Sequence, residues 1–92
     1  MPNKYYIANV IGYYDGAGCD SEIVFAVILG AFEDVESARA DVDNYIKGID
    51  SDADSIRESI HVFENHKMIK TLYRRFDFDY ENYTYVFERS WE

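Results

Sequence analysis

The chain has 92 residues, of which 48% are hydrophobic and 17% aromatic, and it carries a formal net charge of −9. This length supports one hydrophobic core, so we predict a single domain over residues 1–92, and the apolar content is too high for a disordered chain. The acidity disfavours direct binding to nucleic acid or to an anionic membrane, and it favours a basic protein as the partner.

The cysteine content and the N-terminus bear on where the protein acts. Cys19 is the only cysteine, so an internal disulfide is excluded and a reducing compartment is favoured. The first residues lack the basic and apolar regions of a signal peptide. The longest apolar run, residues 23–32, is about half as long as a membrane-spanning helix requires. We therefore expect a cytoplasmic protein without a membrane segment.

The first third of the chain predicts a β-hairpin. Residues 5–14 are rich in Tyr, Ile and Val without a helical period, and they lead into a glycine-containing stretch, residues 15–18, that suits a turn. Residues 22–32 are apolar on both faces, as expected for a central strand that is covered on both sides or partly covered by a partner. We expect the two segments to pair in antiparallel orientation.

The next segment predicts the main helix. Asp34 can cap the first turn, and Lys47 followed by Gly48 suits the last turn. Apolar residues recur at spacings of three and four and form one stripe, which consists of Val35, Ala38, Val42, Tyr45, Ile46 and Ile49. The acidic residues Asp41 and Asp43 lie outside this stripe, so we expect them on the solvent side of the helix.

The second half of the chain predicts a short helical turn and then a meander of three strands. Ser55 and Glu58 fit the S-x-x-E capping box that opens helices. From Ile60 the apolar period becomes two, and the expected turns and strands cover residues 65–67, 68–80, 81–82 and 83–91. The predicted fold is α+β, with an antiparallel sheet of about five strands in the sequence order ββαβββ and one main helix packed on one face.

One sequence pattern resembles a calcium-binding loop. Asp50, Asp52 and Asp54 match its first three ligand positions. Ser55 stands where the turn glycine belongs, and His61 stands where the bidentate glutamate belongs. We therefore predict a solvated connection and no metal site.

Two further patterns fall short of the chemistry that they suggest. Residues 16–21 follow a strand as a dinucleotide fingerprint would, but Ser21 replaces the third glycine and a strand follows, so we predict no cofactor. Cys19 has acidic neighbours that disfavour the thiolate, and His61 and His66 lack the spacing of a helical metal pair. We predict no catalytic residue and no enzymatic activity.

Residues 76–81 alternate between aromatic and acidic side chains. A strand places Asp77, Asp79 and Glu81 on one face about 7 Å apart, a pitch broadly comparable to that of phosphates along nucleic acid. A solvated face, or an edge protected by charge, would show the same alternation. The predicted partner-binding residues are these three together with Asp41, Asp43, Asp50, Asp52 and Asp54.

In size, acidity, aromatic content and lack of a catalytic motif, the chain resembles the small acidic inhibitors that phages and mobile elements make against host defence nucleases, the anti-CRISPR and anti-restriction proteins. That resemblance implies a nucleic-acid mimic that binds a basic nuclease or effector. The alternative is a structural or regulatory interaction module that forms a homodimer through its Tyr- and Phe-rich strands, with charge serving solubility. The third alternative is a small enzyme or ligand-binding protein that uses the aromatic residues and Cys19.

Overall fold

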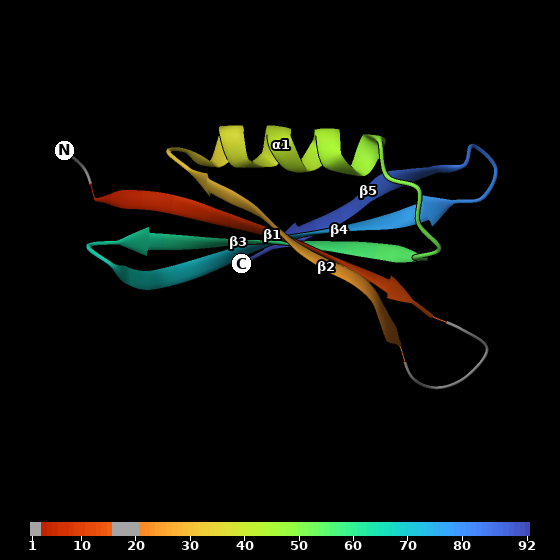
Figure 1. Cartoon of the computed structure of the whole chain (residues 1–92), viewed down its shortest axis with the longest axis horizontal. Coiled ribbons are helices and arrows are strands. Elements are labelled where there is room, and N and C mark those ends of the chain that lie inside the picture. The colour runs from red at the N-terminus through yellow and green to blue at the C-terminus, as the bar shows by residue number, and fades with distance from the viewer. Residues whose placement is uncertain (1–2, 16–20) are drawn as a thin grey trace.

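The computed structural model describes residues 3–15 and 21–92, and in it one helix lies across one face of a five-stranded antiparallel sheet (Figure 1). The elements are β1 (Lys4–Tyr14), β2 (Glu22–Phe32), α1 (Val35–Lys47), β3 (Ser55–Glu64), β4 (Lys67–Asp79) and β5 (Thr84–Trp91). The strands lie in the order β2-β1-β3-β4-β5. The predicted α+β fold and its ββαβββ order are confirmed. No helix within the described ranges is long and apolar enough to cross a membrane.

Helix α1 begins and ends where the sequence predicts. The Oδ1 atom of Asp34 accepts a hydrogen bond from the backbone N–H of Ser37 at 2.7 Å. This bond holds the pKa of the Asp34 carboxyl below its ordinary value. At the other end, the N–H of Gly48 donates to the carbonyl oxygen of Asn44 at 3.3 Å. The helix therefore has both of the caps that its sequence indicates.

The hydrophobic core lies between α1 and the sheet face beneath it. Its buried members come from β1, α1, β3 and β4, and they are Ala8, Val10, Ala38, Val42, Ile46, Ile56, Ile60 and Phe76. Gly12 shares this face, and a Cβ atom at that position would clash with the ring of Phe25. The glycine thus allows an aromatic side chain of β2 to lie across β1.

No element within residues 3–15 and 21–92 covers the opposite face of the sheet, which we call the open face. Because cross-strand partners share a face, the pairing of Arg57 with Arg75 and of Arg75 with Arg89 places three arginines in one row there. Aromatic pairs flank this row: Tyr73 and Trp91 stack with ring centroids 5.3 Å apart. The open face therefore carries charged and aromatic side chains, whereas the face beneath α1 holds the hydrophobic core.

Two expectations for the elements were wrong. Strand β2 is an edge strand and not a central one. The apolar side chains on one side of β2 pack toward α1. Those on the other side are not covered, and Ile23 and Ile28 there are 63% and 72% exposed. Ser55 and Glu58 belong to β3 instead of capping a helical turn, because residues 55–58 pair with β1 and β4 on both sides.

The turns of the meander agree with the sequence. Asn65 and His66 connect β3 to β4 with φ angles of 54° and 68°, the positive values that a two-residue hairpin turn requires. Strand β4 ends at Asp79, and the turn to β5 covers residues 80–83. The predicted glycine turn between β1 and β2, with Cys19, lies in large part outside the described residues.

Candidate functional site

Seven of the thirteen exposed acidic residues within residues 3–15 and 21–92 lie on α1 and its flanking connections. We define the acidic layer as the acids of α1 and its flanking connections: Glu33, Asp34, Glu36, Asp41, Asp43, Asp50 and Asp52. All seven are exposed, and residues 33–52 contain only Arg39 and Lys47 as basic residues, so the segment carries a net charge of −5. Four predicted binding residues, Asp41, Asp43, Asp50 and Asp52, belong to this layer.

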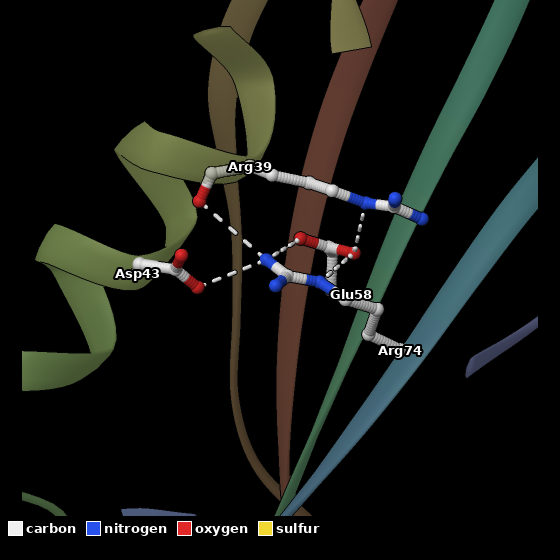
Figure 2. Close-up of polar contacts among 4 residues, drawn as sticks. All are labelled: Arg39, Asp43, Glu58 and Arg74. Atoms are coloured by element: carbon white, nitrogen blue, oxygen red, sulfur yellow. Dashed lines mark hydrogen bonds and ion pairs between the residues drawn. The ribbon is translucent and has the colours of Figure 1, made fainter. Parts of the chain in front are cut away.

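A buried ion-pair network connects α1 to the sheet (Figure 2). Glu58 of β3 is fully buried, and its carboxylate accepts two hydrogen bonds from Arg74 of β4, at 2.8 Å from Nε and 2.6 Å from Nη2. The same Nη2 donates to Oδ1 of Asp43 at 3.0 Å and to the carbonyl oxygen of Arg39 at 3.4 Å. The Nε atom of Arg39 lies 3.8 Å from Oε2 of Glu58.

The charges of this network balance, since two arginines face two carboxylates. Burial alone would lower the pKa of the Arg74 guanidinium. The hydrogen bonds and negative charges of Glu58 and Asp43 outweigh this effect, so the pKa is raised. The bidentate pairing of this guanidinium with Glu58 positions α1 on β3 and β4. We assign it a structural role.

The three acidic residues predicted to form a row along β4 have different environments in the structure. Asp77 accepts a hydrogen bond from Nε of Arg75 at 3.0 Å on the open face. Asp79 accepts hydrogen bonds from the side chain of Asn82 at 2.7 Å and from the backbone N–H of Glu81 at 2.9 Å, and these bonds, the one from Asn82 first, lower its pKa. Glu81 lies in the turn beyond the strand. Two of the three carboxylates are therefore engaged within the chain.

The three aspartates that resemble a calcium loop, Asp50, Asp52 and Asp54, also differ in their contacts. Asp50 and Asp52 are exposed, whereas Asp54 accepts hydrogen bonds from the backbone N–H of Asp15 at 2.8 Å and from the hydroxyl of Tyr80. The backbone of Asp54 also bonds to β1 and β4, which fixes the connection to the sheet. Within residues 3–15 and 21–92, no group of three or more His, Cys, Asp and Glu side chains is arranged to hold a metal ion.

A cavity of about 750 Å³ opens at one end of the sheet, and we call it the tyrosine cavity. At this end, on the right in Figure 1, the end of β1, the start of β2, the connection from α1 to β3, and the turn from β4 to β5 come together. Its lining consists of Tyr14, Glu22, Ile23, Val24, Ser51, Asp52, Ala53, Asp54, Phe78, Tyr80 and Tyr83. No sequence pattern indicates this site, because the segments that form it are far apart in the chain.

A second cavity of about 510 Å³ adjoins the first one through shared lining residues. Val24, Ser51 and Asp52 line both cavities, and the second extends over Phe25 and Tyr45 toward Asp50. The two cavities thus connect the end of the sheet to the acidic layer. Asp52 is the predicted residue that belongs to both regions.

Comparison with known proteins provides no further guide to this site. No protein-family model, no curated protein and no solved structure matches the chain.

Proposed function

We propose that this protein is a non-enzymatic inhibitor whose acidic layer binds the basic nucleic-acid-binding surface of a partner protein. The observation that carries the proposal is the excess of acidic charge on the helix side. The acidic layer there has a net charge of −5, whereas on the open face Arg75 and Arg89 are paired with the acids Asp77 and Glu88. Charge that serves solubility alone is expected to be mixed in sign over the surface.

The arrangement favours docking through the helix side. The acids of this layer project from one helix and its two ends, so their fields add over a single face and attract a basic surface. Asp41, Asp50 and Asp52 have no hydrogen bond or ion pair to another side chain within the described residues, so they are free to bind lysines and arginines that otherwise bind phosphates. Rim charges of this type act mainly on the association rate and on its salt dependence.

Competition with nucleic acid tests the proposal. The protein is immobilised to capture its partner from the lysate of a candidate host, and the purified complex is challenged with DNA or RNA. We expect the nucleic acid to displace the protein, and affinity to fall steeply with salt because exposed charges are screened within about 10 Å at 0.1 M. A complex that withstands both nucleic acid and salt would contradict the proposal.

Matched charge removal localises the interface. The variant Asp41→Asn, Asp50→Asn, Asp52→Asn removes three free carboxylates of the acidic layer. The control Asp77→Asn, Asp79→Asn, Glu81→Gln removes the same charge around the end of β4. We expect the first variant to slow association far more than the control. Equal effects would mean that the partner senses only the net charge of the protein. That result would contradict an interface at the acidic layer.

The free edge of β2 favours a second candidate function, a homodimeric interaction module. Residues 23–32 contain no charged side chain, and Ile23, Val24 and Ile28 are 63%, 42% and 72% exposed along an edge with unpaired backbone groups. Natural edge strands usually carry charges that prevent pairing. Light scattering during size-exclusion chromatography decides this: a dimer that Ile28→Lys converts to a monomer supports it, and a wild-type monomer at high concentration contradicts it.

A further inference from the structure

We propose that the tyrosine cavity is a binding site for a guanidinium group, and that an arginine side chain of the basic partner enters it. The first statement stands on the cavity alone, whereas the owner of the arginine rests on the function proposed above.

The cavity concentrates the exposed apolar surface of the molecule. Eleven large hydrophobic side chains are exposed in the described part of the chain, and five of them line this one cavity. They are Tyr14 at 45%, Ile23 at 63%, Val24 at 42%, Tyr80 at 64% and Tyr83 at 80% exposure. Exposed apolar side chains that converge on a concave surface of this size are typical of a binding site.

The charge of the lining selects a cation. Glu22, Asp52 and Asp54 line the cavity, and none of the residues described as its lining is basic. Tyr80 and the backbone of Asp15 donate hydrogen bonds to Asp54 and so orient it. The bond to Asp54 raises the pKa of the Tyr80 hydroxyl, which therefore remains a donor. An anion is repelled here, and a neutral apolar ligand would remove water from the carboxylates without pairing them.

Two carboxylates are free to bind the ligand. Glu22 and Asp52 make no hydrogen bond or ion pair through their side chains within residues 3–15 and 21–92, and both are exposed. They approach the cavity from different elements, Glu22 from β2 and Asp52 from the connection before β3. A group that binds both must carry several donors.

The combination of tyrosine rings and carboxylates favours guanidinium over ammonium. A guanidinium is planar and weakly hydrated, so it stacks on an aromatic ring while its edge donates two parallel hydrogen bonds to a carboxylate. Its aliphatic stem can lie against the apolar side chains Ile23 and Val24 at the wall. An ammonium group carries the same charge, but it is not planar and cannot donate two parallel hydrogen bonds to one carboxylate.

A titration of the intact protein with small probes tests the site without knowledge of the partner. The probe is N-acetyl-arginine amide, its neutral isostere is N-acetyl-citrulline amide, and the aromatic NMR signals of the tyrosines are the readout. We expect saturable shifts at Tyr14, Tyr80 and Tyr83 in the millimolar range, with binding at least about tenfold weaker for citrulline and clearly weaker for N-acetyl-lysine amide. Non-saturable shifts, or equal binding of citrulline, would overturn the assignment.

Two matched variants separate the cavity from bulk charge. Glu22→Gln with Asp52→Asn removes the two free carboxylates, and Glu36→Gln with Asp41→Asn removes the same charge from α1. All four side chains are exposed, so both proteins should fold, which their backbone NMR spectra will verify. We expect the first variant to weaken arginine binding about tenfold and the second to leave it unchanged. An equal loss in both would show that the probe senses net charge only.

The two proposals fail in different measurements. Loss of arginine selectivity in the titration overturns the guanidinium site, whatever the partner is. A partner complex that the variants of the acidic layer do not weaken contradicts the proposed function, while the titration result stands. Glu22 lines the cavity but lies outside the acidic layer, so Glu22→Gln alone tests the owner of the arginine. A complex weakened by this change assigns the arginine to the partner, and an unaffected complex refutes that assignment.

Discussion

Each face of the sheet carries an arginine–carboxylate pair, but the two pairs have different roles. On the helix side, Glu58 and Arg74 pair beneath α1, where their side chains are 0% and 13% exposed. On the open face, Arg75 and Asp77 pair at a similar distance while their side chains remain 24% and 39% exposed. A charge pair in the core specifies how the layers fit, whereas a pair in water contributes little energy and leaves its charges available. Burial, more than residue type, thus decides what an ion pair does here.

The largest difference between the faces should come from Glu58. The change Glu58→Ala removes the bidentate partner of Arg74 and leaves its guanidinium with Asp43 and the carbonyl oxygen of Arg39. We expect unfolding free energy to fall by about 3 kcal/mol, the lower end of the cost of breaking a buried pair. Urea denaturation monitored by circular dichroism measures this loss. The matched change on the open face, Asp77→Ala, should cost less than about 1 kcal/mol.

A double variant then separates the lost pair from the unpaired charge. Glu58→Met with Arg74→Leu replaces both partners with apolar groups, and it should recover most of the stability that Glu58→Ala loses. If the double variant is as unstable as the single one, the network contributes specific binding energy that an apolar core does not replace.

Isoleucine truncation compares the same side chain on both faces. Ile60 is fully buried beneath α1, whereas Ile28 on the open side of β2 is 72% exposed. We expect Ile60→Ala to lower unfolding free energy by about 2–5 kcal/mol and Ile28→Ala to change it by less than about 0.5 kcal/mol. A large loss for Ile28→Ala at high protein concentration, and not at low concentration, would instead reveal a dimer through β2.

The helix cap predicts a smaller, pH-dependent effect. Because the folded pKa of Asp34 lies below its ordinary value of 3.8, the charged carboxylate adds stability above that value, and the gain disappears as pH falls through the folded pKa. Asp34→Asn keeps a capping oxygen but removes the charge. The stability difference between wild type and variant should therefore shrink as thermal unfolding is measured from neutral to strongly acidic pH. A constant difference would mean that the charge of Asp34 is irrelevant.

The smallest expected effect is that of calcium on the aspartate triplet. Asp54 already accepts two hydrogen bonds within the chain, and the glycine and glutamate of a calcium loop are missing. Millimolar calcium should therefore leave the Tm unchanged, since ligand-linked stabilisation requires real affinity. Magnesium serves as the control for ionic strength, and a shift of several degrees with calcium alone would contradict the prediction.

Local signals accounted for most elements of the fold. The cap at Asp34, the glycine after Lys47 and the stripe of residues at spacings of three and four define α1 in sequence and in structure. The alternation in the second half defines the meander, with the Asn65-His66 turn. The signal at Ser55 and Glu58 misled, because a capping box and an alternating strand share those residue types. A glutamate between Ile56 and Ile60 was the available clue that Glu58 faces the core.

The sequence by itself determined the class of the fold, the helix with its caps, the strand segments and the strong acidity, since each depends on residues that are near neighbours in the chain. Only the tertiary structure decided that β2 lies at the edge, that Glu58 pairs with Arg74, and that Arg57, Arg75 and Arg89 share a row. It also divided the acidic residues into free and engaged ones and assembled the tyrosine cavity from four distant segments. These features depend on strand order and register, which arise from long-range packing that no local pattern encodes.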